Sequence, residues 1–200
     1  LIGISSLESA LYKAVNWEGT LFFYLSNEIS DSKYWDGWEQ KFPDKNDLIN
    51  WMPLFHLRDV VVNYSDEEFV AEINTIIDIN NFIDYYIFIN LISAFDNRGK
   101  NNFLVSKSKN NPIFIIPWDL DGSLGRDWDG SKTGHTDIIT NNLFSRLLSL
   151  NPNGFKNQLK NRWLTLRNNS LNNSHLLNFL DENIAIINKT EIIELENLIW

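Results

Sequence analysis

Hydrophobic and polar residues alternate in two short stretches near the start of the chain. Residues 11–15 have the sequence Leu-Tyr-Lys-Ala-Val, and residues 38–42 have the sequence Trp-Glu-Gln-Lys-Phe. A period of two residues is typical of β-strands, and the aromatic residues and glycines around the two stretches favour loops between them. The pattern therefore predicts that residues 1–45 form short strands and loops.

From residue 46 onward the hydrophobic spacing changes to the three and four residues of an α-helix. We expect a first helix over residues 47–62. The sequence Ser65-Asp66-Glu67-Glu68 has the form of a capping box, so a second helix should begin at Ser65. Asp78 can cap a third helix from Ile79 to about Ala94. Because the apolar residues of this helix lie on nearly every face, we expect it to be buried.

Two short apolar runs, Phe103-Leu104-Val105 and Ile113-Phe114-Ile115-Ile116, are separated by the polar residues 106–112. Such a pattern predicts a β-hairpin with a loop of medium length. After another loop at residues 117–136 the spacing is helical again. Three more helices are expected, over residues 141–150, over residues 155–167 and after the cap Ser174. Together these patterns predict an α+β fold that is mainly α, with one embedded hairpin.

The composition narrows the class of protein. The chain has 200 residues, of which 44% are hydrophobic, enough for a well-packed core. Its net charge of −9 disfavours nucleic acid as a partner, and the lack of cysteine excludes disulfides and thiol nucleophiles. No apolar run reaches about 18 residues, so we expect no transmembrane segment. Because the chain starts at Leu1 without an initiator methionine or a signal peptide, we expect a fragment or a trimmed product.

Two polar loops flank the predicted hairpin, over residues 96–102 before its first strand and over residues 117–125 after its second. The start of one antiparallel strand lies beside the end of the other, so the two loops should share one end of the hairpin. The oxygen-bearing side chains expected to converge there are Asp96, Asn101, Asp119 and Asp121. Carboxylates gathered in one place repel one another unless a cation binds them, and hard oxygen ligands suit Mg²⁺, Mn²⁺ or Ca²⁺.

The spacing from Asp96 to Asn101 is D-x-x-x-x-N. A kinase catalytic loop uses this spacing for a base and a metal ligand, and places its main metal-binding aspartate after the following strands. The order of Asp96, Asn101, hairpin and Asp119 matches that arrangement. A kinase also needs a lysine on the nucleotide phosphates, and Lys13 and Lys41 are candidates because both lie on predicted strands.

The most specific string in the chain is Ile116-Pro117-Trp118-Asp119-Leu120-Asp121-Gly122, followed by Gly125-Arg126. Together with Leu11-Tyr12-Lys13-Ala14, residues 38–43, and Asp96-Asn97 with Lys100-Asn101, it resembles the spore-coat protein H (CotH) kinase-like proteins. These are atypical bacterial protein kinases. The resemblance covers most of the chain and corresponds to the C-terminal part of the kinase-like domain.

The resemblance implies an atypical protein kinase that transfers the γ-phosphate of ATP to Ser of a protein substrate with Mg²⁺ or Mn²⁺. Asp96 would be the catalytic aspartate, Asn101 and Asp119 would be metal ligands, and Asp121 would be a further ligand where the family accepts Glu. Residues 46–200 would form a kinase-like C-lobe and residues 1–45 the remnant of a β-rich N-terminal region. No G-x-G-x-x-G precedes the site. Members are mostly extracellular, on the cell surface or in the spore coat.

Two other functions fit parts of the sequence. A calcium-binding or surface interaction module could use Asp119, Asp121, Asp127 and Asp129. The EF-hand template fails there, because Leu124 and Gly130 stand at its sixth and twelfth positions. A phosphatase of the haloacid-dehalogenase type would use Asp119 as a nucleophile in D-x-D-G-S, but that fold needs a parallel sheet with further β–α units downstream.

Overall fold

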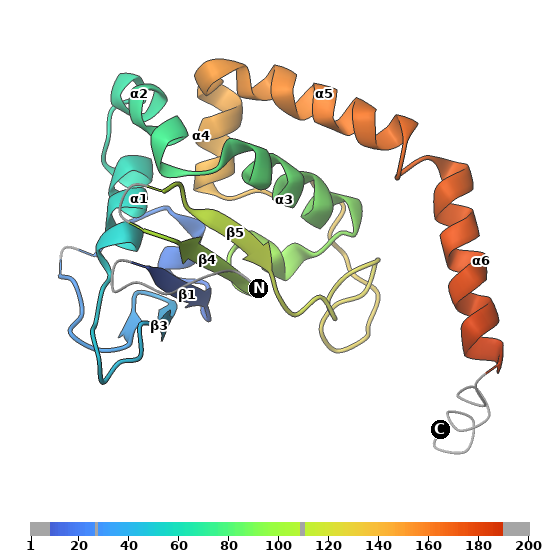
Figure 1. The fold of residues 1–200 in the computed structure, drawn as a ribbon, viewed down its shortest axis with the longest axis horizontal. Helices are drawn as coiled ribbons and strands as arrows, with labels where there is room; N and C mark the ends of the chain where they lie inside the picture. The colour runs from blue at the N-terminus through green and yellow to red at the C-terminus, as the bar shows by residue number, and fades with distance from the viewer. Residues whose placement is uncertain (1–8, 27, 109–110, 190–200) are drawn as a thin grey trace. The chain divides into compact units, whose positions relative to one another are not determined.

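A computed structural model of the chain describes residues 9–26, 28–108 and 111–189 (Figure 1). The chain divides into two compact units, Leu1–Gln158 and Leu159–Trp200. In the described residues we find six α-helices and five β-strands, which confirms an α+β fold. The sheet and all the residues of the candidate site lie in the first unit.

The sheet contains five antiparallel strands in the order β2-β3-β1-β4-β5. They are β1 (Ala10–Ala14), β2 (Tyr34–Trp35), β3 (Trp38–Phe42), β4 (Asn102–Ser106) and β5 (Phe114–Pro117). Both stretches with alternating residues are strands, and the two apolar runs form the expected hairpin, in which Leu104 pairs with Ile115. The periodicity of two residues and the hairpin pattern are therefore confirmed.

Strands from both predicted segments belong to this one sheet. Tyr12 of β1 pairs with Gln40 of β3 on one side and with Leu104 of β4 on the other. The division near residue 45 into a β-rich remnant and a helical lobe stays a prediction. Because β1 pairs with β4, it lies directly beside the hairpin, and its last residues lie at the same end of the sheet as the two polar loops.

The first helix, α1 (Met52–Val62), begins at Met52 instead of Asp47. Pro53 is accommodated in the first turn, where its missing N–H costs no hydrogen bond, and residues 44–48 form a turn of their own. The second helix, α2 (Asp66–Ile76), has the predicted capping box: Glu68 N donates to Ser65 Oγ, and Ser65 N donates to Glu68 Oε2 at 2.9 Å.

Asp78 caps α3 (Ile79–Leu91) by accepting a hydrogen bond from Asn81 N at 2.9 Å. The helix ends before the predicted Ala94, and Ser93 adopts a left-handed conformation with φ 55°. Side chains of α3 are buried on several faces, as expected for a central helix. Its most deeply buried members are Phe82, Ile83, Tyr85 and Ile89.

The remaining helices are α4 (Asn142–Leu150), α5 (Phe155–Asn168) and α6 (Asn173–Lys189). Asn141 caps α4, and short 3₁₀ turns lie at η1 (Gly19–Leu21), η2 (Phe95–Arg98) and η3 (Pro152–Gly154). The prediction that Ser174 caps the last helix is wrong. His175 N donates to Asn172 Oδ1 at 2.8 Å, so Asn172 satisfies the free N–H and Ser174 lies inside the helix.

The core of the first unit lies between the sheet and its helices. Ala10, Tyr12 and Ala14 point to one face of β1 and are at most 1% exposed. On that face Tyr12 stacks on Trp51 at a ring-centre distance of 5.3 Å. Between the helices, Phe144 of α4 packs on Tyr86 of α3 at 4.9 Å. Burying side chains of this size contributes roughly 1.5–3 kcal/mol each. The hairpin is thus attached to a rigid core.

No helix in the described part of the chain has the length and apolar character needed to cross a membrane.

Candidate active site

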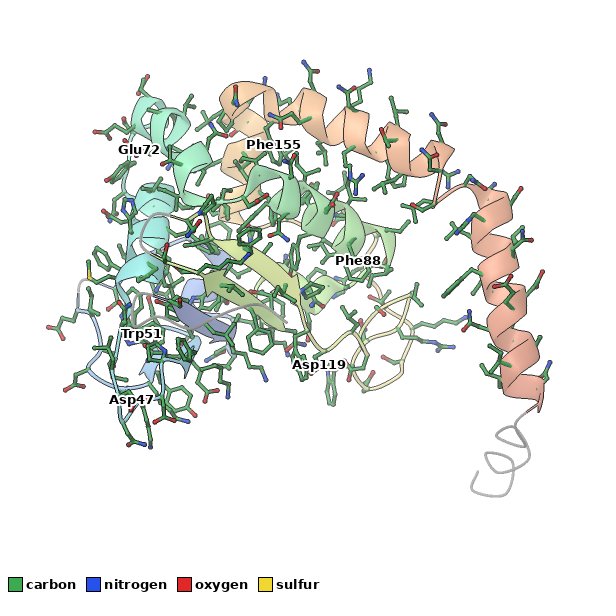
Figure 2. All side chains as sticks on the ribbon, viewed as in Figure 1. Asp47, Trp51, Glu72, Phe88, Asp119 and Phe155 are labelled. Carbon is green, nitrogen blue, oxygen red and sulfur yellow. The ribbon has the colours of Figure 1, made fainter. Side chains whose placement is uncertain are left out.

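The two polar loops meet at one end of the hairpin. Asn102 of β4 pairs with Pro117 of β5, and one position further out Trp118 N donates to the carbonyl oxygen of Asn101 at 2.9 Å. Figure 2 shows Asp119 in the loop that leaves β5. The residue before Asp119 is therefore hydrogen-bonded to Asn101, which brings the ends of the two polar loops together.

Asp96 lies in η2, directly after the buried helix α3. Its backbone oxygen accepts hydrogen bonds from the N–H groups of Gly99 and Lys100, which closes the loop into a tight turn. Its side chain is half-buried, and Oδ2 is 2.8 Å from Lys100 Nζ. The ion pair occupies one carboxylate oxygen at the start of the loop and places a cation beside it.

Asn97 connects the two loops, and no sequence argument assigned it a role. Its side chain is buried, and Nδ2 donates to the carbonyl oxygens of Asn101 at 2.6 Å and of Trp118 at 2.9 Å. The Tyr85 hydroxyl donates to the backbone oxygen of Asn97 and so attaches η2 to α3. In the sequence, the one feature that could have indicated a role for Asn97 is its position directly after the candidate catalytic residue Asp96.

Asn101 and Asp119 both have left-handed backbone conformations, with φ of 57° and 52°. Asn and Asp tolerate this region better than most residues, but without glycine it still costs free energy that the surroundings must supply. Each of these residues is joined to the hydrogen-bonded end of the hairpin. The two predicted metal ligands therefore share an unusual conformation that the structure holds in place.

Asp121 lies further out in the second loop and is exposed, and its Oδ1 accepts a hydrogen bond from Gly122 N at 2.8 Å. Within the described residues, no three His, Cys, Asp or Glu side chains form a group that could hold a metal ion. Asp96, Asp119 and Asp121 thus do not form such a group by themselves. Mg²⁺ commonly takes one or two protein carboxylates and completes its shell with phosphate oxygens and water. The hard oxygen atoms of Asn101 and Asp119 suit that kind of site.

A lysine and two aromatic rings lie on the sheet face next to Asp119. Lys13 Nζ is 5.7 Å from the centre of the Trp118 ring, and Trp118 contacts Phe103 edge-on. The Trp118 side chain is about half exposed. Lys13 pairs in register with Phe103, one position from the end of β1, so its ammonium group is close to the loop that carries Asp119.

Lys41 lies on β3 and has a different partner. Its Nζ is 2.8 Å from Glu39 Oε2, and Lys33 Nζ is 3.0 Å from Glu39 Oε1. Burial favours the neutral form of Glu39, but the hydrogen bonds from Lys41 and Lys33 outweigh this effect, so the pKa of the Glu39 carboxyl is lowered. Lys41 is therefore engaged in an ion pair two strands away from the hairpin.

Aromatic and cationic side chains surround η2. The Arg98 guanidinium lies 3.9 Å from the centre of the Phe95 ring and 5.4 Å from that of Trp17, and burial lowers the pKa of Arg98. His135, from the loop after β5, stacks on Phe95 with an interplanar angle of 2°. Gly99 packs so closely on Trp17 that an added Cβ would be 2.8 Å from Trp17 Cε3. The loop with Asp96 is thus packed on both sides.

The geometry can be compared with known proteins. A family model described as CotH kinase protein matches residues 6–197 of the chain. The chain belongs to the CotH kinase family. This match confirms the family that the sequence motifs indicated, and membership supports a kinase-like function and an association with the spore coat. Among curated proteins, the comparison finds no match for this chain.

Membership of the CotH kinase family agrees with the topology, while the phosphatase alternative does not. A haloacid-dehalogenase-type phosphatase needs a parallel, doubly wound sheet with its nucleophile after a central strand. In the part of the chain that the structure describes, every pair of neighbouring strands is antiparallel, and Asp119 follows the edge strand β5. The string D-x-D-G-S is therefore a local coincidence of sequence.

Proposed function

We propose that the chain is the catalytic part of an atypical protein kinase that transfers the γ-phosphate of ATP to Ser of a protein substrate. The observation that carries this proposal is the amide of Asn97, which joins the D-x-x-x-x-N loop to the backbone beside Asp119. A kinase needs a base, an amide ligand and a carboxylate ligand close together, and these two hydrogen bonds link the loops that carry the three residues at one end of the hairpin.

In this proposal the Ser hydroxyl oxygen attacks the γ-phosphorus, the bond from that phosphorus to the β,γ-bridging oxygen breaks, and ADP leaves. Asp96 accepts the hydroxyl proton on the carboxylate oxygen that Lys100 does not bind. General base catalysis of this kind contributes about 10²–10⁴-fold. Lys100, whose Nζ is 2.8 Å from Asp96, would add positive charge beside the transferred phosphoryl group.

Asn101 and Asp119 would hold the divalent ion through their side-chain oxygens, with Asp121 as a candidate for a further, outer position. When bound, Mg²⁺ or Mn²⁺ neutralises charge on the phosphate oxygens. Lys13 is favoured over Lys41 as the phosphate-binding lysine, because Lys13 lies beside Trp118 and Lys41 is paired with Glu39. The exposed ring of Trp118 offers a stacking surface for the adenine base.

The proposed kinase activity also implies a division of the chain into lobes, a class of partner and a place of action. Residues 46–200 would act as the C-lobe, and the strands of residues 1–45 would be the remnant of a β-rich region that covers the nucleotide. The partner would be a protein substrate rather than nucleic acid, in keeping with the net charge of −9. The place of action would be the cell exterior, the cell surface or the spore coat.

The test is phosphate transfer by the longest available form of the protein, incubated with γ-labelled ATP, Mg²⁺ or Mn²⁺ and a Ser-rich protein. Label should appear on Ser, and Asp96→Asn should reduce kcat by about 10²–10⁴-fold while ATP still binds. Asp119→Asn should abolish the rise in Tm that Mg²⁺ with ATP produces.

Two results would contradict the proposed kinase activity. A rise in Tm with Ca²⁺ alone, insensitive to ATP, would favour the calcium-binding module. Label on Asp119 instead of Ser would favour the phosphatase chemistry in spite of the antiparallel sheet.

A further inference from the structure

We propose that Asn97 is the positioning residue of this site, and that its side-chain amide fixes the backbone of both Asn101 and Asp119. The inference rests on the proposed function, since it concerns the two residues proposed as metal ligands. It goes beyond that function because Asn97 is too deeply buried, at 1% exposure, to touch nucleotide or substrate. It would act only through the two loops.

The Asn97 amide donates to two backbone carbonyl groups, and each is part of, or directly precedes, one of the proposed metal ligands. One is the carbonyl of Asn101 itself, at 2.6 Å, and the other is that of Trp118, at 2.9 Å. The Trp118 carbonyl belongs to the peptide group that ends at the nitrogen of Asp119. Holding this peptide plane restricts the φ angle of Asp119, which is in the left-handed region. The amide therefore stabilises a conformation that Asp would otherwise leave.

The orientation of the amide follows from its partners. Both neighbours are carbonyl oxygens, so only the NH₂ group can face them, and the buried Oδ1 has no hydrogen-bond partner among the described residues. A buried carbonyl oxygen that loses its donor costs roughly 1–3 kcal/mol. Leucine has the branched shape of asparagine but no N–H group, so it would remove both donated hydrogen bonds.

A second buried amide repeats the pattern beside it. Asn102 Nδ2 donates to the carbonyl oxygens of Gly99 at 3.1 Å and of Lys100 at 3.2 Å, and in the part of the chain that the structure describes its Oδ1 also has no hydrogen-bond partner. Tyr85 completes the group, since burial raises the pKa of its hydroxyl and keeps it a donor to the Asn97 backbone. Buried polar groups that donate hydrogen bonds to loop carbonyls restrict the conformations of those loops.

The matched control is Asn81 on α3. Its Nδ2 donates to the carbonyl oxygen of Ile115 at 3.1 Å, and its Oδ1 accepts from Ile115 N at 2.7 Å. It thus also makes two hydrogen bonds to the hairpin, one donated and one accepted, but in the middle of β5. Replacing Asn81 by Leu should lower stability in a similar way while leaving the ends of the loops unchanged.

The experiment compares Asn97→Leu with Asn81→Leu in two measurements. Binding of Mn²⁺ in the presence of ATP, followed by electron paramagnetic resonance, should weaken about 10–100-fold in Asn97→Leu and less than twofold in Asn81→Leu. Hydrogen exchange without metal or nucleotide should be faster at the Trp118 and Asp119 amides in Asn97→Leu alone. If Asn97→Leu does not fold, Asn97→Ala, which removes the amide without adding bulk, should show both effects, with Asn81→Ala as its control.

The two readouts separate this inference from the proposed function. If the unaltered protein binds neither Mn²⁺ nor ATP, the proposed function fails, and the exchange measurement still tests Asn97. If the protein binds Mn²⁺ and Asn97→Leu binds it equally well, the inference is overturned and the kinase proposal stands. Equal exchange rates in the two variants, or equal loss of Mn²⁺ binding, would likewise overturn it.

Discussion

Replacing Gly99 by alanine should disturb the candidate catalytic loop directly. An added Cβ would lie 2.8 Å from Trp17 Cε3 and 2.9 Å from Leu21 Cδ2, both closer than carbon atoms approach each other in folded proteins. The ring of Trp17 also contacts the cations of Arg98 and Lys100, so it cannot move without disturbing neighbours of Asp96. Either this ring or the loop with Asp96 must shift.

The size of the effect follows from overpacking. Forcing a methyl group into such a contact costs about 1–3 kcal/mol, which for a protein of this size lowers Tm by about 2–12 °C. A loop displacement approaching 1 Å would reduce turnover by about 10²-fold, because transfer requires alignment of the reacting groups. Gly134 is the control, since a Cβ there meets no atom within 4 Å.

The assay is thermal unfolding and phosphate transfer for Gly99→Ala, Gly134→Ala, Trp17→Leu and the double variant Gly99→Ala/Trp17→Leu. Gly134→Ala should stay within about 0.5 kcal/mol of the original stability. Because the smaller leucine makes room for the methyl group, the double variant should be more stable than the sum of the single effects by about 1 kcal/mol. Strictly additive effects would show that the contact between Gly99 and Trp17 does not control this loop.

Two further predictions concern the charged residues of the sheet. Lys13→Met should raise the KM for ATP by about 10–100-fold in steady-state kinetics. Lys41→Met should raise it by less, because Lys41 is paired with Glu39. A larger rise in Lys41→Met than in Lys13→Met would refute the choice of Lys13 as the phosphate-binding lysine. Glu39→Gln should lower stability by about 1 kcal/mol above the ordinary carboxyl pKa of 4.5, and denaturant melts should show this loss shrinking as the pH falls through the lowered pKa of Glu39. A loss that persists in acid would contradict the ion pairs as its cause.

The elements of the fold were predictable where local signals act alone. The alternation in residues 11–15 and the capping box at Ser65 depend on side chains and backbone groups close in sequence, and both are confirmed. The hairpin was predictable for the same reason. The ends of the helices were harder to predict. The helix α1 begins at Met52, with Pro53 in its first turn, and α6 is capped by Asn172 instead of Ser174.

The sequence predicted which loops carry the candidate site residues, but not the contacts that those residues make. Residue spacing placed Asp96, Asn101 and Asp119 at one end of a hairpin, but no spacing rule connects Asn97 to the carbonyl of Trp118, 21 positions away. The pairing of Lys41 with Glu39 and the packing of Gly99 on Trp17 also arise from tertiary structure. Such contacts depend on the strand register and on the packing of η2, which local sequence does not specify.

The register of the hairpin therefore matters more for the site than the motif itself. The spacing D-x-x-x-x-N is common by chance, and it becomes a candidate site here because Asn102 pairs with Pro117. That pairing is set by the buried pair Leu104 and Ile115, since a slip of one residue would turn these apolar side chains toward the opposite face of the sheet. The same slip would move Asp119 by about 3.3 Å relative to Asn101 and remove the Trp118 carbonyl from the reach of Asn97. The hydrophobic contacts that stabilise the sheet thus also fix the distance between the two proposed ligands.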